Sequence, residues 1–135
     1  MAAGYSNTPL FKKLGLKDGC TIKTIHAPAH YKELLGDAAE RISFKPQATK
    51  DLDVIHFFTN SENELNSTLP KLMQQISKSG SIWVSWYKKA SGKATELNDN
   101  ILREAALAIG LVDVKVCAVD EDWSGLKLVY RLKDR

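Results

Sequence analysis

The sequence predicts an α/β fold in which helices cover both faces of a mainly parallel, six-stranded sheet that ends in an antiparallel hairpin. Three observations carry this prediction. Strand-like and helix-like segments alternate along most of the chain, two short segments are almost entirely apolar, and the last part holds two alternating segments joined by a polar turn. Apolar strands are typical of a parallel sheet covered on both faces, and right-handed crossovers place helices on each face.

The composition is that of an ordinary globular domain. The chain has 135 residues, of which 44% are hydrophobic and 26% charged, and this length allows a core without metals or disulfides. No repeat, linker or low-complexity segment divides the chain, so we expect one domain over residues 1–135. No apolar run has the length of a signal peptide or a membrane helix, which favours a cytoplasmic protein outside the membrane.

Helix and strand signals are clear near the N-terminus. Thr8 followed by Pro9 is typical of a helix start and Gly15 of a helix end, so we expect a short helix over residues 9–14. Cys20–Ile25 then alternates weakly and is rich in β-branched residues, as strands are.

The next segments alternate in the same way. Ala29–Leu35 is expected to be a helix that stops at Gly36, and Arg41–Lys45 alternates like a strand with one buried face. Asp53–Phe58 is nearly continuous in apolar residues. We expect it to be a parallel strand covered on both faces.

The longest helix is expected from Ser61 to Lys78. Ser61 and Glu64 have the spacing of a capping box, and a stripe of leucines and other apolar residues at helical spacing follows them. Pro70 is expected to kink this helix or to restart it.

The rest of the chain is expected to form a strand, a helix and a hairpin. These elements are Ser81–Trp86 after a turn at 79–80, Leu97–Ile109 up to Gly110, and Val112–Val119 joined to Leu126–Leu132 by a tip at 120–125.

Charge and cysteine content exclude several function classes. The net charge of +3 (19 Lys and Arg against 16 Asp and Glu) is too small to indicate nucleic-acid binding. The exception is a basic stretch, 71–93, that contains five lysines and no acid, although such a stretch is commonly a solvated face. Cys20 and Cys117 lack metal-site spacing and are expected to be reduced thiols, with a disulfide between them as the alternative.

Several segments of the second half follow one another as in Rossmann-like methyltransferases. The strand Asp53–Phe58, the helix with Leu69–Pro70, and the turn and strand Lys78–Val84 precede a further helix and a closing hairpin. This order resembles the later strands of that superfamily over roughly residues 50–132. The resemblance implies a Rossmann-like three-layer sandwich that is a truncated version of the methyltransferase fold.

The part of the chain that would hold a cofactor departs from that superfamily. The resemblance implies S-adenosylmethionine bound against glycine-rich backbone after the first strand, but residues 26–31 read His-Ala-Pro-Ala-His-Tyr. Glycine lets the backbone approach a ligand where a Cβ would collide. The eight glycines form no GxG pattern, which excludes a dinucleotide fingerprint and a P-loop. We therefore expect no cofactor.

Four further segments carry a more specific resemblance. They are Gly4–Gly15, Trp83–Gly92, Gly110–Asp120 and Trp123–Lys127. Together they resemble a bacterial family of short proteins, the domain of unknown function 3052, over nearly the whole chain. This resemblance implies no activity.

A ligand site is expected at the carboxyl ends of the parallel strands, near the point where the strand order reverses. Four segments should meet there: 26–31, 59–61, 86–93 and 120–125. The third segment combines aromatic rings, lysines, a hydroxyl and a glycine, which together can hold a phosphate or a carboxylate. The candidate ligand-binding residues are Trp86, Lys88, Lys89, Ser91, Trp123 and His26.

An ordinary structural role is the alternative for two of these lysines. Lys88 and Lys89 would then pair with the acids at 120–122 while Trp86 and Trp123 shield the contact. Surface pairs of this kind contribute only ~0–1 kcal/mol each. Both roles remain open at this point.

Histidines and serines offer no complete catalytic or metal site. His26 and His30 are four residues apart, with Glu33 beyond them, but zinc needs three or four converging ligands, so we expect loop or capping histidines and no metal. His56 lies inside an apolar strand and is expected to be a hydrogen-bonded core residue. No serine lies in a GxSxG elbow, which argues against a hydrolase.

Three functions follow from these observations. The first is a non-catalytic domain that keeps a methyltransferase-like frame and binds a small anionic ligand or a protein partner at the strand-end crevice. The second is a transferase with an atypical nucleotide or S-adenosylmethionine site. The third is a nucleic-acid or assembly module that uses the basic stretch 71–93.

Overall fold

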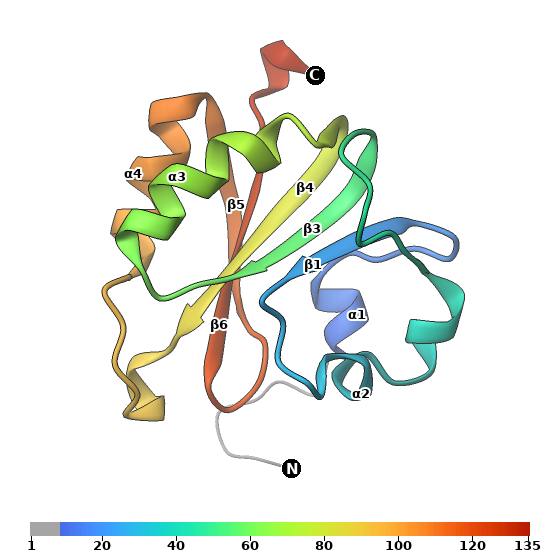
Figure 1. Cartoon of the computed structure of the whole chain (residues 1–135), viewed down its shortest axis with the longest axis horizontal. Coiled ribbons are helices and arrows are strands. Elements are labelled where there is room, and N and C mark those ends of the chain that lie inside the picture. The colour runs from blue at the N-terminus through green and yellow to red at the C-terminus, as the bar shows by residue number, and fades with distance from the viewer. Residues whose placement is uncertain (1–8) are drawn as a thin grey trace.

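The computed structural model describes residues 9–135 as a sheet with helices on both faces (Figure 1). The predicted fold class is confirmed. The strands are β1 (Thr21–Ile25), β2 (Ser43–Phe44), β3 (Leu52–Phe58), β4 (Ile76–Tyr87), β5 (Leu111–Ala118) and β6 (Trp123–Tyr130). Their spatial order is β2-β1-β3-β4-β6-β5. The first four strands run parallel, and β6 is antiparallel to both β4 and β5.

Two pairs of helices enclose this sheet. The helices are α1 (Leu10–Lys13), α2 (Tyr31–Leu35), α3 (Glu62–Met73) and α4 (Asp99–Ile109), with short 3₁₀ helices at Gly36–Arg41, Lys89–Ser91 and Leu132–Asp134. The first pair, α1 and α2, covers one face of the sheet, and α3 with α4 covers the other. The predicted cap at Thr8 lies outside the described residues.

The largest departure from the sequence prediction lies between α3 and β4. The helix was expected to reach Lys78, but it ends at Met73, and β4 begins already at Ile76. Pro70 lies inside the helix, where its missing N–H removes one backbone hydrogen bond. Ile76 is 5% exposed and belongs to the core between the sheet and α3 and α4. Burial of this side chain therefore favours the strand over continued helix.

The expected turn at 79–80 is a bulge inside β4. Between two paired positions β3 advances by two residues, Leu52 to Val54, while β4 advances by five, Ile76 to Ser81. Gly80 lies in this bulge, where a Cβ would be 2.8 Å from the Leu52 carbonyl oxygen. Only glycine allows the two backbones to approach this closely.

A buried chain of hydrogen bonds crosses the core on the α1 and α2 side. The Tyr31 hydroxyl lies 2.7 Å from Nδ1 of His56, and Nε2 of His56 lies 2.7 Å from the Ser85 hydroxyl. His56 is 0% exposed and stacks on Phe58 with 4.2 Å between the ring centroids. Burial lowers the pKa of His56 to about 3 and raises that of Tyr31. The prediction of a hydrogen-bonded core histidine is confirmed.

Two further features concern the rest of the described chain. Cys20 and Cys117 are free thiols, and burial raises the pKa of both. Within residues 9–135, no helix has the length and apolar character of a membrane span.

Candidate functional site

The four segments predicted to form a crevice reach one edge of the sheet (Figure 1). His26 follows β1, Thr59 follows β3 and Lys88 follows β4. The strand order reverses at β1, because β2 lies on one side of it and β3 on the other. The tip of the C-terminal hairpin reaches the same edge, where the Lys88 N–H donates to the Asp122 carbonyl at 2.9 Å.

Side chains span the gap between β1 and β3 at the reversal point. His26 has a φ of 58°, a left-handed conformation that residues with a side chain rarely adopt. Its Nε2 lies 3.3 Å from Oε2 of Glu64 on α3. The Thr59 hydroxyl donates to the other carboxylate oxygen of Glu64. Because these side chains lie across the reversal point, this part of the protein does not offer the bare glycine backbone that a nucleotide would need.

A groove of about 480 Å³ lies beyond the end of β4. Trp86 and Tyr87 line it from the strand, and Lys89 and Lys93 line it from the following loop. Asn98 lines it from the start of α4, which it caps by accepting the N–H of Ile101. The groove therefore combines aromatic rings with two ammonium groups. We name it the β4-end groove.

Hydrogen bonds hold the loop after β3 against the loop after β4. The Asn60 side-chain oxygen accepts the Tyr87 N–H at 2.8 Å, and the Glu96 N–H donates to the Asn60 carbonyl at 3.0 Å. A second cavity of about 440 Å³ lies here and shares residues 94–95 with the β4-end groove. The two loops thus form one continuous rim.

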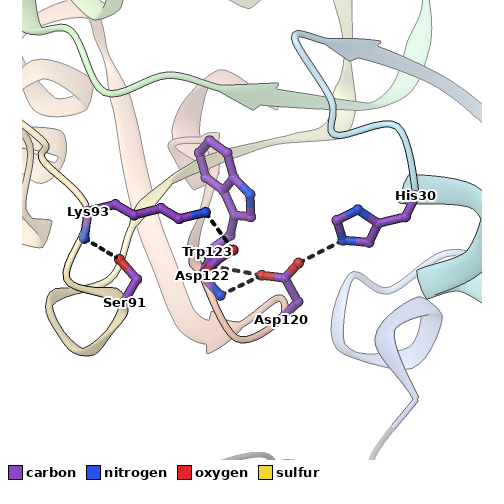
Figure 2. A network of polar contacts seen from close by, with 6 residues as sticks. All are labelled: His30, Ser91, Lys93, Asp120, Asp122 and Trp123. Atoms are coloured by element: carbon purple, nitrogen blue, oxygen red, sulfur yellow. Dashed lines mark hydrogen bonds and ion pairs between the residues drawn. The ribbon is translucent and has the colours of Figure 1, made fainter.

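Lys93 connects this rim to the hairpin tip (Figure 2). Its ammonium lies 2.9 Å from the Asp122 carboxylate and 5.3 Å from the centroid of the Tyr87 ring. The hydrogen bond to Asp122 raises the pKa of Lys93. Tyr87 in turn packs on Trp123, with 4.4 Å between the ring centroids. The charge of Lys93 is therefore already matched within the protein.

Asp120 shapes the hairpin tip and ties it to α2. One carboxylate oxygen accepts the N–H groups of Asp122 and Trp123 at 2.8 and 2.9 Å, and the other lies 3.0 Å from Nε2 of His30 (Figure 2). This turn is tighter than the expected tip at 120–125, because β6 already begins at Trp123. Among the described residues, no three His, Cys, Asp or Glu side chains could hold a metal ion.

The fold places the six predicted ligand-binding residues in different parts of this edge rather than in one site. Trp86 and Lys89 line the β4-end groove, and the Ser91 hydroxyl beside it accepts the Lys93 N–H at 3.1 Å. Trp86 packs in the core under α3 and α4, whereas Trp123 packs on the opposite face of the sheet. His26 lies with Glu64 at the reversal point.

The ion pair with the hairpin acids that was expected of Lys88 and Lys89 is made by a third lysine of the same loop. Lys93 makes the ion pair with Asp122, and Lys88 reaches the hairpin through its backbone N–H. Lys89 begins a short 3₁₀ helix and is exposed. Within residues 9–135 its ammonium makes no ion pair.

Tyr87 and His30 lie in the predicted segments 86–93 and 26–31 but were not among the six candidate ligand-binding residues. Tyr87 lies opposite Trp123 in the register of β4 and β6, so strand alternation from Trp86 would have placed it on the Trp123 face. His30 lies at the N-cap position of α2, in agreement with the expected loop or capping residue, but its side chain makes no cap hydrogen bond and contacts Asp120 of the hairpin. No sequence signal identifies that contact, because the two residues are 90 positions apart.

Comparison with known families and structures identifies one family and one fold. The family model of DUF3052, described as a protein of unknown function, matches residues 12–132. Comparison with curated proteins finds no match.

Methyltransferase structures share the fold at low sequence identity. A crystal structure assigned to the type 11 methyltransferases, from Sulfolobus solfataricus, has a TM-score of 0.61 at 13% identity and covers 90% of this chain and 89% of its own. A TehB-like SAM-dependent methyltransferase from Corynebacterium glutamicum has a TM-score of 0.56 at 10% identity, with 96% and 91% covered. Magnesium protoporphyrin IX methyltransferase from Synechocystis, with bound SAM, has a TM-score of 0.58 at 11% identity, with 90% and 74% covered. The likeness therefore extends over more of the chain than residues 50–132.

Proposed function

Because this chain belongs to the DUF3052 family of proteins of unknown function and has a methyltransferase-like fold, we propose that it is a non-catalytic domain that binds a small anionic ligand. The β4-end groove is the proposed site. The observation that carries the proposal is the contrast between its two lysines: Asp122 neutralises Lys93, while Lys89 makes no ion pair within the described chain. An ammonium without a counter-charge beside aromatic rings favours a phosphate or a carboxylate.

The non-catalytic part of the proposal rests on the surroundings of the reactive side chains. His56 and Ser85 form the sole buried histidine–serine contact of the described residues, and both are 0% exposed. A substrate would have no access to them without opening the core. At the reversal point, His26 and Glu64 contact one another and leave no bare backbone for a nucleotide.

Replacing the rim lysines tests the ligand proposal. We expect ATP or ADP to bind the wild-type protein in calorimetric titrations, and the Lys88→Ala/Lys89→Ala double variant to bind roughly tenfold more weakly or worse, since a hydrogen bond to a charged group contributes ~1.5–3 kcal/mol. Lys89→Ala alone should account for most of the loss. Binding should also weaken as salt is added.

The matched control is Lys71→Ala, which removes one exposed lysine on α3 and should leave the affinity unchanged. Equal affinity of the double variant and the wild type would contradict the role of these lysines. An absence of binding by either probe at millimolar concentration would contradict a small anionic ligand and favour a protein partner.

A transferase that uses S-adenosylmethionine is the second candidate, because structures of similar fold contain that molecule. A ligand at a hundredfold excess over its Kd adds ~2.7 kcal/mol to stability, which raises the melting temperature by several degrees. We expect no rise with millimolar S-adenosylmethionine, since the His26 and Glu64 side chains occupy the bend after β1. A clear rise would favour the transferase over the non-catalytic domain.

The course of β4 argues against a nucleic-acid or assembly surface on the basic stretch 71–93. Lys78 lies near the start of β4 with its ammonium 4.2 Å from the Tyr130 ring centroid, whereas Lys88, Lys89 and Lys93 follow the end of the strand. At about 3.3 Å per residue, the regular part of β4 after its bulge, from Ser81 to Lys88, already separates these groups by roughly 23 Å. The lysines therefore do not support one continuous basic face.

A further inference from the structure

A cavity of about 560 Å³ lies at the amino end of the parallel strands, opposite the β4-end groove. Its wall on one side is the loop between α1 and β1, residues 15–20. The sheet forms the other side, through Val54 of β3, Ser81 of β4, and Lys127 and Val129 of β6. Its size lies within the ~300–1,000 Å³ typical of small-molecule sites. We name it the amino-edge cavity.

Ser81 is a buried hydroxyl without a partner in this cavity. It is 6% exposed, and its neighbours across the sheet, Val54 and Val129, also line the cavity. The other buried polar residues of the described chain all use their side chains in hydrogen bonds; they are His56, Thr59, Ser85 and Asp120. Among residues 9–135 the Ser81 side chain makes no hydrogen bond. Such an exception in a core calls for a missing partner.

Lys127 adds a cation without a counter-ion to the lining of the same cavity. It makes no hydrogen bond or ion pair in the described part of the chain. Its ammonium lies close to Gly15, where an added Cβ would be 3.6 Å from Nζ, and its partner across the strands is a second cation, Lys115. Burial and Lys115 both lower the pKa of Lys127. An anion in the cavity would act in the opposite direction, because its charge favours the protonated ammonium.

The lining of the cavity also includes two acidic side chains, Asp53 and Asp18. Oδ2 of Asp53 accepts the backbone N–H and the hydroxyl of Thr21 at 2.8 and 3.2 Å, while Oδ1 has no hydrogen bond within residues 9–135. Asp18 also lines the cavity, but Arg41 neutralises it at 3.0 Å. The amino-edge cavity is therefore lined by a cation from β6, a hydroxyl from β4 and a free carboxylate oxygen from β3.

We propose that the amino-edge cavity binds a small hydroxylated anion, a sugar phosphate or a sugar acid, whose anionic group contacts Lys127 and Ser81 and whose hydroxyls donate to Asp53. This site is separate from the β4-end groove, and neither proposal depends on the other. The anionic group supplies the acceptor that the Lys127 ammonium and the Ser81 hydroxyl lack. The ligand hydroxyls supply donors for the remaining oxygen of Asp53.

Amide chemical shifts of the ¹⁵N-labelled protein test the proposal with three probes: glucose 6-phosphate, gluconate and glucose. We expect the phosphate or the carboxylate to shift the amides of Ser81 and Lys127 in a saturable way, and glucose to leave them unchanged. The comparison of the two acids identifies the anionic group that the cavity prefers. An absence of saturable shifts at these amides with either acid at millimolar concentration would overturn the proposal.

Three variants separate binding from folding. Lys127→Met keeps the aliphatic stem and should weaken binding roughly tenfold or more. Ser81→Ala removes an unpaired hydroxyl, so it should weaken binding without loss of stability, an outcome that a purely structural serine would not produce. Lys12→Met, on the exposed side of α1, is the control and should bind as the wild type does.

The β4-end variants keep the two proposals distinguishable. Lys88→Ala/Lys89→Ala should leave the shifts at Ser81 unchanged, and Lys127→Met should leave ATP binding at the β4-end groove unchanged. Unchanged affinity of Lys127→Met for the acid that binds would overturn the amino-edge site alone.

Discussion

Lowering the pH from 6.5 toward 3 is expected to destabilise the protein by about 1.4 kcal/mol per pH unit through His56 alone. Burial lowers the pKa of this imidazole from 6.5 to about 3 in the folded protein, whereas the unfolded chain keeps the ordinary value. The unfolded state therefore binds the proton first as the pH falls. The stability that depends on neutral His56 is complete above about pH 6.5 and decreases steadily below it.

Urea denaturation of the wild type and of His56→Gln between about pH 4 and pH 7 measures this effect. Glutamine keeps a donor and an acceptor for Tyr31 and Ser85 but does not titrate. The wild type should lose stability more steeply than the variant, while the carboxylates contribute equally to both slopes. Parallel slopes would contradict the prediction. If the variant does not fold, the ring resonances of His56 in the wild type give its protonation state directly.

The substitution Trp83→Ala is expected to lower the free energy of unfolding by about 3–5 kcal/mol. Trp83 is 0% exposed, and its indole N–H donates to the Leu14 carbonyl at 3.1 Å. It also packs against Gly125, where a Cβ would be 3.2 Å from the indole. Alanine would leave a cavity and a buried carbonyl without its donor. The side chain therefore holds the end of α1 to the centre of the sheet.

Chemical denaturation at neutral pH measures this cost, with Trp123→Ala as the matched control. Trp123 is a tryptophan of the same sheet face that is only half-buried, so its removal should cost less. Trp83→Phe should cost less than Trp83→Ala, because it keeps most of the packing and loses the hydrogen bond, worth ~0.5–1.5 kcal/mol. Similar costs for Trp83→Ala and Trp123→Ala would show that Trp83 does not anchor α1.

Local sequence patterns were sufficient to predict most elements of the fold. The apolar run Asp53–Phe58 is β3 less its first residue, Leu52, because a strand buried on both faces must be apolar throughout. Ser61 caps α3 by accepting the N–H of Glu64 at 3.1 Å, as the spacing of the two residues predicted. Gly110 ends α4 in a left-handed conformation. Each of these signals acts over a few neighbouring residues and can be read without knowledge of the remaining chain.

The element boundaries that the sequence predicted wrongly depend on contacts with residues far away in the chain. The pattern of apolar residues continues at helical spacing to Ile76, but this residue pairs with Leu52 in the sheet. Gly80 was expected to form a turn because glycine commonly does so, whereas the approach of the β3 carbonyls requires it in a strand. In both places a contact with β3, more than twenty positions earlier in the chain, overrides the local preference.

The candidate site shows the same division. The sequence by itself determined that aromatic residues and lysines would follow the end of β4 and that no glycine-rich loop would follow β1. Only the tertiary structure decided that Lys93 rather than Lys89 meets Asp122, and that Ser81 and Lys127 share a cavity at the opposite edge. The physical reason is that composition and spacing act along the chain, whereas charge pairing and unpaired groups depend on strand order and register, which bring distant residues together.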